Sequence, residues 1–361
     1  MKKDWENMTH WITRIVEQPT MDATSASKAD VATIGRQVSY EWLNIYHYDG
    51  AYESDQAMFS RIDGITAAVK RGDLVVYQYP TLNGPRFETS FIDRMNSRGV
   101  NVVIFIHDVE NLRGSNITMS GFDEYGYFNK ATALIVHNPI MATALQKHGV
   151  SKPMIPLYMF DIIDNSQPQN IPSRQLVFAG NINKSPFLGD WPYDTPIKVF
   201  GVASFSDLRS KLGNNPSVDY RGALYRDKLN EAIGNGLGLV WDVNTRDGNY
   251  ATYAQYNNPY KLSFYLSHAI PVILSRDAAP AKFITENRLG FALNELNDID
   301  SLMDRLTDKE LADVTTNVYR LSALLHTGYF TKRALLAAEQ AVYFRSLQPL
   351  VNLIEKRNDL A

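Results

Sequence analysis

The sequence predicts an α/β protein made of two doubly wound domains followed by C-terminal helices. Its 361 residues exceed one ordinary domain and suit two, each able to bury its own core. Short apolar runs alternate with amphipathic stretches, which is the pattern of βαβ units in a parallel sheet. The alternation occurs twice, on either side of Asp161–Ser173, a polar stretch with two prolines that is typical of a linker.

The first alternation predicts an N-terminal Rossmann-like domain over residues 1–165. The expected strands are Trp11–Val16, Trp42–Tyr46, Leu74–Tyr79, Val102–Ile106, Ala133–Val136 and a weaker one at Met154–Leu157. The expected helices are Ser25–Val38, Asp55–Lys70, Arg86–Ser97, Phe122–Lys130 and Pro139–Lys147.

The second alternation predicts another Rossmann-like domain over residues 166–328. Its expected strands are Gln175–Ala179, Ile197–Phe200, Ser217–Tyr220, Leu237–Trp241, Pro271–Leu274 and Gly290–Ala292. Its expected helices are Phe205–Leu212, Tyr225–Ile233, Pro259–His268, Pro280–Asn287 and Ile299–Leu306. The segment Leu311–Val351 is almost wholly helical by composition and period. By analogy this is the GT-B plan, in which two Rossmann-like domains face a cleft and residues 329–361 return to the first domain.

Composition excludes several classes of function. The chain has no cysteine, so disulfides, thiolate nucleophiles and iron–sulfur clusters are excluded. A net charge of -3 with scattered basic residues makes nucleic acid an unexpected partner. Charged residues interrupt the apolar residues near the N-terminus, and no run approaches a membrane span, so we expect a cytoplasmic protein.

Candidate binding residues follow the strands of the second half, where open α/β sheets bind ligands. Asn181 and Lys184 lie in a turn after the strand Gln175–Ala179, where backbone amides and one cation would suit a phosphate; a plain strand-to-loop turn is the alternative. Tyr220 is the last residue of the expected strand Ser217–Tyr220, and Arg221 follows it directly. A tyrosine face can stack on a nucleobase and arginine can neutralise a phosphate, although packing explains a single tyrosine as well.

A third candidate is the helix start at Asn257-Asn258-Pro259-Tyr260-Lys261. Asparagine followed by proline is typical of the first turn of a helix, where free amides lie close to Lys261. Asn257, Tyr260 and Lys261 together would suit a pyrophosphate.

In the first half, His107 and Asp108 directly follow the apolar strand Val102–Ile106. A base at this position would suit a transfer that inverts the reacting centre, whereas loop capping and packing are the alternatives. Thr24 opens a helix after the first strand, where hydroxyls and amides could meet a phosphate or an acceptor.

Other motifs lack the context that their chemistry needs. Gly234–Gly238 precedes a strand instead of linking a strand to a helix, so it does not indicate a dinucleotide fold, and an epimerase or dehydrogenase is disfavoured. Asp298 and Asp300 resemble a two-aspartate metal motif but lie where an amphipathic helix begins. The histidines show no zinc spacing, and we expect neither a metal nor another cofactor.

Several stretches resemble, in order and spacing, the glucosyltransferases that extend glycans on serine-rich repeat adhesins, a family often described as galactofuranosyltransferase-like. The resemblance spans nearly the whole chain. The matching pieces are Asp63–Ile65, Gly72–Gln78, Phe105–Val109, Phe178–Asn181, Tyr220-Arg221, Gly238–Trp241, Tyr260–Leu262 and Ile270–Ile273. One departure is Lys184, where members carry arginine, so a bidentate phosphate contact is in question there.

The resemblance implies a GT-B enzyme that transfers glucose from UDP-glucose to N-acetylglucosamine on the adhesin, as a metal-independent cytoplasmic homo-oligomer, a tetramer or dimer. The first domain would bind the acceptor and the second the donor. It also implies that Asn181 and Lys184 hold the diphosphate or ribose, that Tyr220 holds the uracil, and that Tyr260 with Lys261 holds the diphosphate. Asp108 remains the candidate base. UDP-N-acetylglucosamine and UDP-galactofuranose remain alternative donors, and a catalytically silent GT-B partner subunit is the alternative function.

Overall fold

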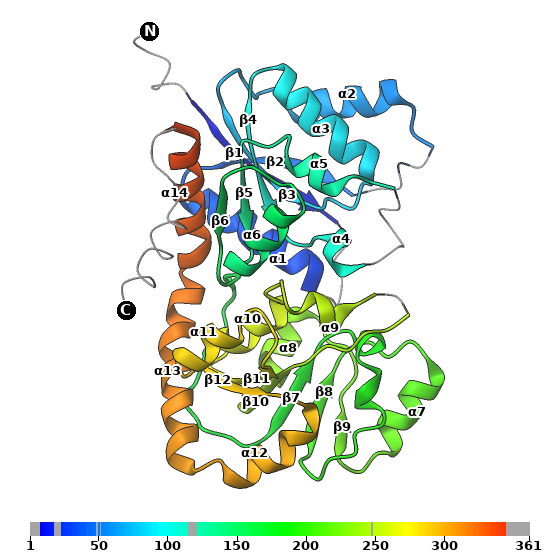
Figure 1. Ribbon diagram of the computed structural model, residues 1–361, viewed down its shortest axis with the longest axis vertical. Coiled ribbons are helices and arrows are strands. Elements are labelled where there is room, and N and C mark those ends of the chain that lie inside the picture. Colours follow the sequence, from blue (N-terminus) through cyan, green and yellow to red (C-terminus); the bar gives the residue numbers. More distant parts are fainter. Residues whose placement is uncertain are drawn as a thin grey trace. The chain divides into compact units, whose positions relative to one another are not determined.

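The computed structural model describes residues 8–17, 23–47, 50, 52–114, 121–246 and 248–343, and the chain forms two compact units. The first unit contains Ser27–Tyr158 and the last helix from Phe330, whereas the second contains Met159–Tyr329. Each unit has one six-stranded parallel sheet with helices packed on it (Figure 1). The predicted fold of two doubly wound α/β domains is confirmed.

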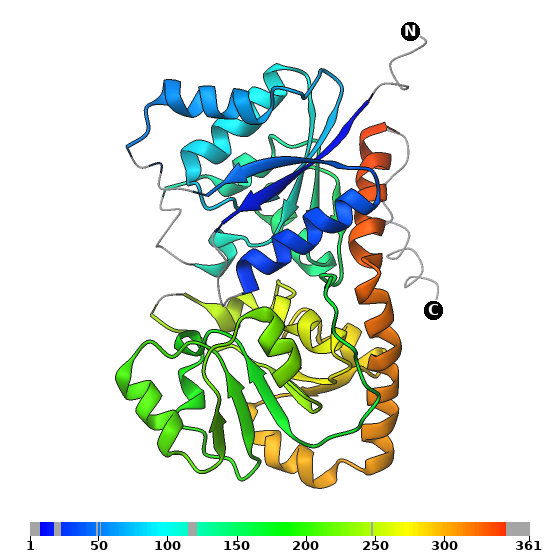
Figure 2. The ribbon, with the colours of Figure 1, turned by 180° about the vertical axis from the view of Figure 1, so that it is seen from behind.

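The first sheet has the strand order β2-β1-β3-β4-β5-β6. Strands β3, β4 and β5 are almost wholly buried, as expected for a parallel sheet covered on both faces. Helix α1 crosses one face (Figure 2), and α2 and α3 lie on the other (Figure 1). The elements are β1 (His10–Val16), α1 (Ala23–Gln37), β2 (Glu41–Tyr46), α2 (Asp55–Ile65), β3 (Leu74–Tyr79), α3 (Pro85–Ser97), β4 (Asn101–Ile106), α4 (Glu110–Arg113), α5 (Glu124–Phe128), β5 (Ala133–Val136), α6 (Pro139–Lys147), β6 (Met154–Pro156) and α14 (Tyr329–Tyr343).

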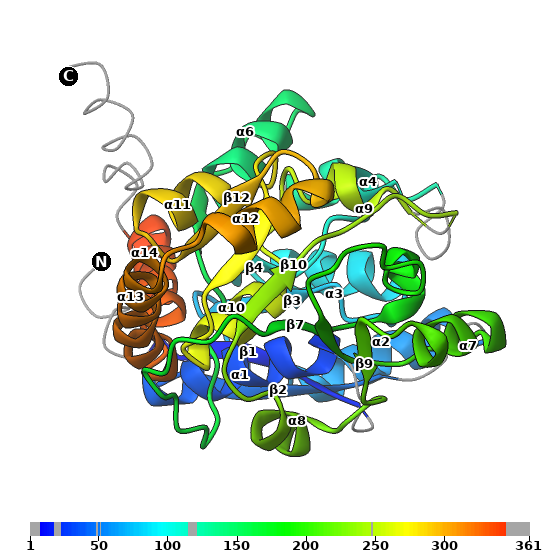
Figure 3. The same ribbon diagram turned by 90° about the horizontal axis from the view of Figure 1, so that it is seen from below.

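The second sheet has the order β12-β11-β10-β7-β8-β9. From β7 the chain continues to β8 on one side, and from β10 it continues to β11 on the other, so the topological switch point lies between β7 and β10. Helix α7 lies beside β9 at one edge of the sheet and α11 beside β12 at the other (Figure 3). The elements are β7 (Leu176–Ala179), η1 (Ile182–Lys184), η2 (Pro186–Leu188), β8 (Ile197–Phe200), α7 (Ser206–Asn214), β9 (Val218–Tyr220), α8 (Arg226–Ala232), β10 (Leu237–Val240), α9 (Tyr250–Tyr253), α10 (Tyr260–Ser267), β11 (Val272–Ser275), α11 (Ala281–Glu286), β12 (Gly290–Leu293), η3 (Leu296–Asp298), α12 (Ile299–Arg305) and α13 (Asp308–His326).

The C-terminal segment differs from the single helical stretch predicted over Leu311–Val351. As far as Tyr343 it forms two helices, because the chain turns at Gly328, whose φ of 74° lies in the left-handed region that favours glycine. Helix α13 belongs to the second unit and α14 to the first, where Glu339 accepts a hydrogen bond of 2.9 Å from Tyr40. The predicted return of the chain to the first domain is therefore confirmed. Although α13 has 19 residues, no described helix carries the apolar run that a membrane span needs.

Helix α2 ends at Ile65, five residues before the predicted end at Lys70. The buried carboxylate of Asp73 accepts hydrogen bonds from the backbone amides of Lys70, at 2.9 Å, and Thr9, at 3.1 Å. These bonds hold the chain in a turn that leads into β3. Helix propensity alone does not reveal this competing partner for the backbone.

The stretch Asp161–Ser173, predicted as a solvated linker, contains no helix or strand but is buried at its start. Phe160, Asp161 and Ile162 are buried, and the side chain of Asp164 is only 7% exposed. Composition reveals the polarity of such a stretch. It does not distinguish a carboxylate in water from one that accepts hydrogen bonds inside the protein.

Gly238, the second residue of β10, explains part of the glycine pattern Gly234–Gly238 at the start of this strand. A Cβ at this position would lie 2.4 Å from Cγ of Tyr265, so the absence of a side chain lets the Tyr265 ring pack directly on the strand. Tyr265 is fully buried on α10, and its hydroxyl oxygen accepts a hydrogen bond of 2.6 Å from the amide of Ala179. The glycine therefore serves the packing of α10 on β10 and β7.

We expect Gly238→Ala to lower the free energy of unfolding by about 1–3 kcal/mol, because the ring or the strand must shift to admit the methyl group. Urea unfolding followed by circular dichroism measures the loss. The matched control is Gly213→Ala on α7, where a Cβ meets no atom within 4 Å and alanine favours the helix. Equal stability of the two variants would contradict the packing role of Gly238.

Candidate functional site

At the carboxyl ends of β7, β8 and β9, glycines let the backbones of neighbouring loops approach each other closely. Gly180, Gly201 and Gly222 follow these strands, and Gly201 donates its amide to the carbonyl of Gly222 at 2.9 Å. A Cβ on Gly201 would lie 1.9 Å from the carbonyl oxygen of Gly180, so only glycine fits between the two loops. Backbone groups are thus accessible at the end of the sheet where open α/β folds bind ligands.

Lys261 is the cation at the switch point between β7 and β10. Its Nζ donates to Oδ1 of Asp242 at 2.7 Å and to the carbonyl of Trp241 at 3.2 Å, both directly after β10. Nζ also lies 5.3 Å from the centroid of the Phe178 ring on β7. Since the side chain of Lys261 is only 15% exposed, this charge is held in one place and partly shielded from water.

The beginning of α10 differs in detail from the predicted start at Pro259. The helix begins at Tyr260 with Pro259 as its N-cap, which makes no side-chain cap hydrogen bond, and the amide of Leu262 donates to the carbonyl of Pro259 at 2.9 Å. Asn257 precedes it with a buried Oδ1 that has no hydrogen-bond partner among the described residues. The Tyr260 ring lies 6.4 Å from that of Phe160. A helix N-terminus with Lys261 in its first turn is suited to an anion.

Asn181 and Lys184 occupy the turn after β7, as predicted. Asn181 is the N-cap of η1, and its Oδ1 accepts the amide of Asn183 at 3.0 Å. Nζ of Lys184 lies 4.9 Å from the centroid of the Tyr250 ring on α9. Lys184 forms no ion pair within the described ranges, so its charge remains available to an anion while the aromatic face orients it.

Tyr220 and Arg221 lie at the other side of the edge, at the end of β9. The Tyr220 hydroxyl donates to the carbonyl of Gly201 at 3.1 Å, which fixes the ring beside the glycine loops. Arg221 is exposed and pairs with Asp219 through Nε at 2.8 Å. Two strands, β7 and β8, separate β9 from β10, so the structure does not bring Arg221 to Lys261. The side chain of Thr24 lies outside the described residues.

A cavity of about 460 Å³ adjoins the partners of Lys261. It lies at the carboxyl ends of β10 and β11 and is lined by aromatic, carboxylate and amide side chains, among them Trp241, Asp242, Asn244, Gln255 and Asp277. Such a mixture of hydrogen-bonding groups and an aromatic surface suits a small polar molecule rather than an apolar one.

In the first unit, His107 and Asp108 follow β4 and have different surroundings. Arg113 of α4 donates to Oδ2 of Asp108 at 2.9 Å, and the Asp108 side chain is 33% exposed. Oδ1 has no hydrogen bond to any described residue. A carboxylate oriented by arginine, with one oxygen available, can accept a proton from a hydroxyl group.

His107 is held as a neutral ring. The side-chain nitrogen of Gln78, Nε2, donates to the carbonyls of Thr13, at 2.6 Å, and Lys28, at 3.1 Å. The side-chain oxygen of Gln78, Oε1, can only accept, so Nε2 of His107, 2.8 Å away, must carry the hydrogen. The other nitrogen, Nδ1, therefore faces the Ser27 hydroxyl at 3.2 Å as an acceptor. Burial, with the charge of Lys28, lowers the pKa of His107 well below its usual value.

Several residues at these edges were not predicted. Asp242 and Tyr250 orient the two lysines, and Gln78 sets the tautomer of His107. Asp242 directly follows the predicted strand Leu237–Trp241, so the rule that singled out the other strand ends also applies to it. Tyr250 and Gln78 carry no sequence signal, because their roles depend on contacts between distant segments.

Asp298 and Asp300 have structural roles, as predicted. Asp298 takes part in a capping box with Glu295, and Asp300 accepts hydrogen bonds from Thr195 through Oδ1 at 2.9 Å and 2.6 Å. Within the described ranges, no group of three histidine, aspartate or glutamate side chains is placed to hold a metal ion.

Comparisons with known protein families and relatives cover both units. The model of the N-terminal domain of the glucosyltransferase 3-like family matches residues 9–159, and that of its C-terminal domain matches residues 176–338. The chain is 32% identical over 338 residues to Glucosyltransferase 3 of Streptococcus gordonii, covering 92% of this chain and 98% of that protein. It is 25% identical over 285 residues to the β-1,6-galactofuranosyltransferase WbbI of Escherichia coli, covering 76% and 82%.

Among solved structures, the chain is similar to HepE of Anabaena in complex with UDP-glucose. The TM-score is 0.58, with 10% sequence identity, and the match covers 91% of this chain and 99% of that one. At this identity the likeness supports the two-domain GT-B fold alone.

The buried histidine His137, which follows β5, makes the first unit sensitive to acid. Burial lowers the pKa of His137 to about 4, although the nearby Asp108 opposes this effect. The unfolded chain protonates the same histidine near pH 6.5. As the pH falls from about 6.5 to 4, the unfolded state gains a proton first, so stability should fall by up to about 3 kcal/mol.

We expect His137→Asn to reduce this loss, measured by urea unfolding of the variant and the unmodified protein at several pH values. The control is His148→Asn at an exposed position, which should retain the pH dependence of the unmodified protein. If all three proteins lose stability in parallel, His137 is not the source.

Proposed function

The chain belongs to the glucosyltransferase 3-like family of GT-B glycosyltransferases, and we propose that it transfers glucose from UDP-glucose to a glycan acceptor. One observation carries the proposal. Lys261 lies at the switch point of the second sheet, in the first turn of α10 and beside a polar cavity. This arrangement suits a diphosphate joined to a sugar.

In the proposed reaction, Lys261 and Lys184 stabilise the negative charge that develops on the leaving diphosphate. The acceptor hydroxyl attacks the anomeric carbon of the donor sugar, and the bond from that carbon to the β-phosphate oxygen breaks. UDP leaves with the bonding electron pair, and the hydroxyl proton passes to Oδ1 of Asp108. His107 is neutral and bonded to Gln78, so it orients this strand end instead of acting as the base.

In the free protein Asp242 balances the charge of Lys261. A bound diphosphate would compete for the same ammonium group and release Asp242, which also lines the cavity. A carboxylate placed there can accept hydrogen bonds from sugar hydroxyls. Tyr220 would contribute a stacking surface for the uracil, and its bond to Gly201 holds it at the edge.

The acceptor and the biological context rest on the family resemblance of the sequence. The proposed acceptor is a serine-rich adhesin that bears N-acetylglucosamine. The proposed enzyme is a cytoplasmic homo-oligomer that needs no metal. The similarity to a galactofuranosyltransferase favours one specific alternative, in which the donor is UDP-galactofuranose.

Calorimetric titration in the presence of a chelator tests the donor. We expect UDP and UDP-glucose to bind with micromolar dissociation constants, and UDP-N-acetylglucosamine and UDP-galactofuranose to bind more weakly than UDP-glucose. Tighter binding of UDP-galactofuranose would change the donor assignment. Failure of every UDP compound to bind would contradict the transferase function.

We expect Lys261→Ala to reduce kcat/KM at least about tenfold, because it removes the cation facing the leaving group. Donor turnover is measured by UDP release with an N-acetylglucosamine acceptor. Lys282→Ala on α11, an exposed lysine paired with Glu286, is the control and should retain full activity. Unchanged activity in a folded Lys261→Ala protein would disprove the assigned role.

For Asp108→Asn we expect kcat to fall by about 10²–10⁴ with little change in the dissociation constant for UDP, since the amide cannot accept the proton. Asp93→Asn, which changes an exposed carboxylate paired with Lys130, controls for the loss of surface charge in the same unit. Similar losses in UDP binding and turnover would instead indicate a structural aspartate.

A further inference from the structure

A buried carboxyl group of the first unit binds the backbone of α4, the short helix that follows Asp108. This group belongs to Glu124, the first residue of α5, and it is fully buried. Its Oε1 accepts hydrogen bonds from the Tyr79 hydroxyl, at 2.8 Å, and from the amide of Glu110, at 3.0 Å. Its Oε2 accepts from the amide of Asn111 at 2.8 Å. The proposed reaction does not use this carboxyl group.

Helix α4 depends on contacts from other elements for its position. It is a single turn of four residues, which is too short to be stable by itself. The buried Val109 fixes the point at which the chain enters the turn, but as the N-cap it provides no side-chain hydrogen bond. The first amides of a helix have no acceptor within the helix, and here Glu124 accepts from the first two. A side chain of another helix therefore takes the place of a cap.

The ion pair of Asp108 spans this turn. Asp108 lies just before the N-cap, and Arg113 is the last residue of α4. Nη1 of Arg113 donates to Oδ2 of Asp108 at 2.9 Å, and its Nη2 pairs with the carboxylate of Glu110. Five residues of extended chain would span roughly 17 Å, so the turn of α4 is what brings Arg113 to Asp108. Loosening of this turn would remove the partner that orients the Asp108 carboxylate.

The contacts of Glu124 require an acceptor at both of its oxygens. A hydroxyl group such as that of Tyr79 can rotate to donate or accept, but a backbone amide can only donate. One backbone amide faces each oxygen, that of Glu110 at Oε1 and that of Asn111 at Oε2. A glutamine in this place would turn its side-chain nitrogen toward one of these amides, whichever way its own amide group is oriented. The carboxylate is therefore the form that serves both amides.

The ionisation of this carboxyl group is sensitive to pH near neutrality. Burial and the nearby carboxylate of Glu110 raise the pKa of Glu124 to about 7, although its three hydrogen bonds oppose the shift. The other titratable groups around it are Tyr79 of β3, Tyr127 of α5 and Glu88 of α3. Burial raises the pKa of both tyrosines, which stay neutral hydroxyl groups, and also that of Glu88.

We propose that Glu124 is a positioning residue for the transfer, because its carboxylate fixes the turn of α4 that holds Arg113 against Asp108. The inference rests on the proposed role of Asp108 as the base. Since Glu124 is fully buried, it acts on the reaction through α4 and not by contact with a substrate.

Turnover and UDP binding of Glu124→Gln test this inference. We expect kcat at about pH 8 to fall at least about tenfold, whereas the dissociation constant for UDP, which is proposed to bind the other unit, stays unchanged. In the unmodified protein, kcat should rise between about pH 6 and 8 as Glu124 loses its proton, and Glu124→Gln should lack this rise. The nearby His137 does not account for the rise, because its pKa is about 4.

A double variant distinguishes positioning from a general loss of structure. If Glu124 acts through Asp108, then adding Glu124→Gln to an Asp108→Asn protein should reduce kcat no further. In the single Glu124→Gln variant, hydrogen exchange should become faster at the amides of Glu110 and Asn111. Full kcat in a folded Glu124→Gln protein, or losses that multiply in the double variant, would overturn the inference.

Asp123→Asn is the matched control, because it removes an exposed carboxylate one residue away. The remaining side-chain oxygen of this variant can still accept from the amide of Gly126, so kcat and its pH dependence should not change. Should Glu124→Gln not fold, Tyr79→Phe replaces it. It removes one hydrogen bond to the carboxylate and leaves both amide bonds, so the rise in kcat should move to higher pH, and an unmoved rise would contradict the inference.

Failure of the proposed function gives a different result. If Asp108→Asn keeps full turnover, or if no UDP compound binds, the proposed base or donor is wrong. Hydrogen exchange at the first amides of α4 in Glu124→Gln then decides alone whether Glu124 fixes the turn.

Discussion

The contact between the Tyr265 ring and Gly238 is the constraint on which the second unit depends. It lets α10 lie directly on β10, and the Tyr265 hydroxyl binds the backbone where β7 ends. Lys261 is four residues before Tyr265, hence on the same face of the helix. A ring seated on the strand therefore also determines where Lys261 lies, which is between Phe178 and the loop after β10. A core contact and the position of Lys261 are thus set by the same glycine.

Most of the fold could be predicted because its signals are local. Buried parallel strands such as Leu74–Tyr79 are apolar throughout, and all twelve expected strands occur within one or two residues of their predicted ends. The errors arise where a side-chain hydrogen bond or a glycine turn ends a helix. The carboxylate of Asp73 holds the turn after α2, and a left-handed Gly328 divides the C-terminal helices. Neither interaction can be deduced from hydrophobic periodicity.

The candidate site could be predicted less completely, for a related reason. Strand ends identify where a parallel sheet offers side chains, and this rule led to the candidates Lys184, Tyr220 and Lys261, which stay predictions. The sequence does not indicate which of these side chains meet. Arg221 follows Tyr220 directly, yet it faces Asp219, whereas Lys261 pairs with Asp242, 19 residues away. Proximity in the chain was a poor guide to proximity at the edge, because the strand order of the sheet separates β9 from β10 by two strands.

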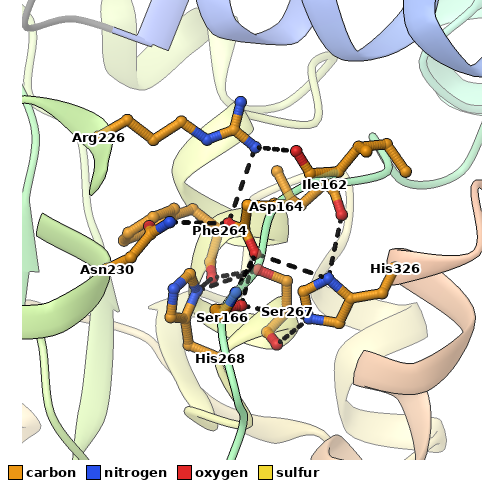
Figure 4. Close-up of polar contacts among 10 residues, drawn as sticks. Ile162, Asp164, Ser166, Arg226, Asn230, Phe264, Ser267, His268 and His326 are labelled. Carbon is orange, nitrogen blue, oxygen red and sulfur yellow. Dashed lines mark hydrogen bonds and ion pairs between the residues drawn. The ribbon is translucent and has the colours of Figure 1, made fainter.

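The two ends of helix α10 have different surroundings. The amides at the start of a helix carry partial positive charge and the carbonyls at its end partial negative charge. At the end of α10, the carbonyl oxygen of Ser267 lies 2.9 Å from Nε2 of His326, in the last turn of α13 (Figure 4). At its start, Pro259 provides no side-chain cap, and Lys261 in the first turn pairs with the carboxylate of Asp242. The partial charge at the start of α10 and the ammonium group of Lys261 therefore have the same sign, and both would attract the diphosphate of the proposed donor.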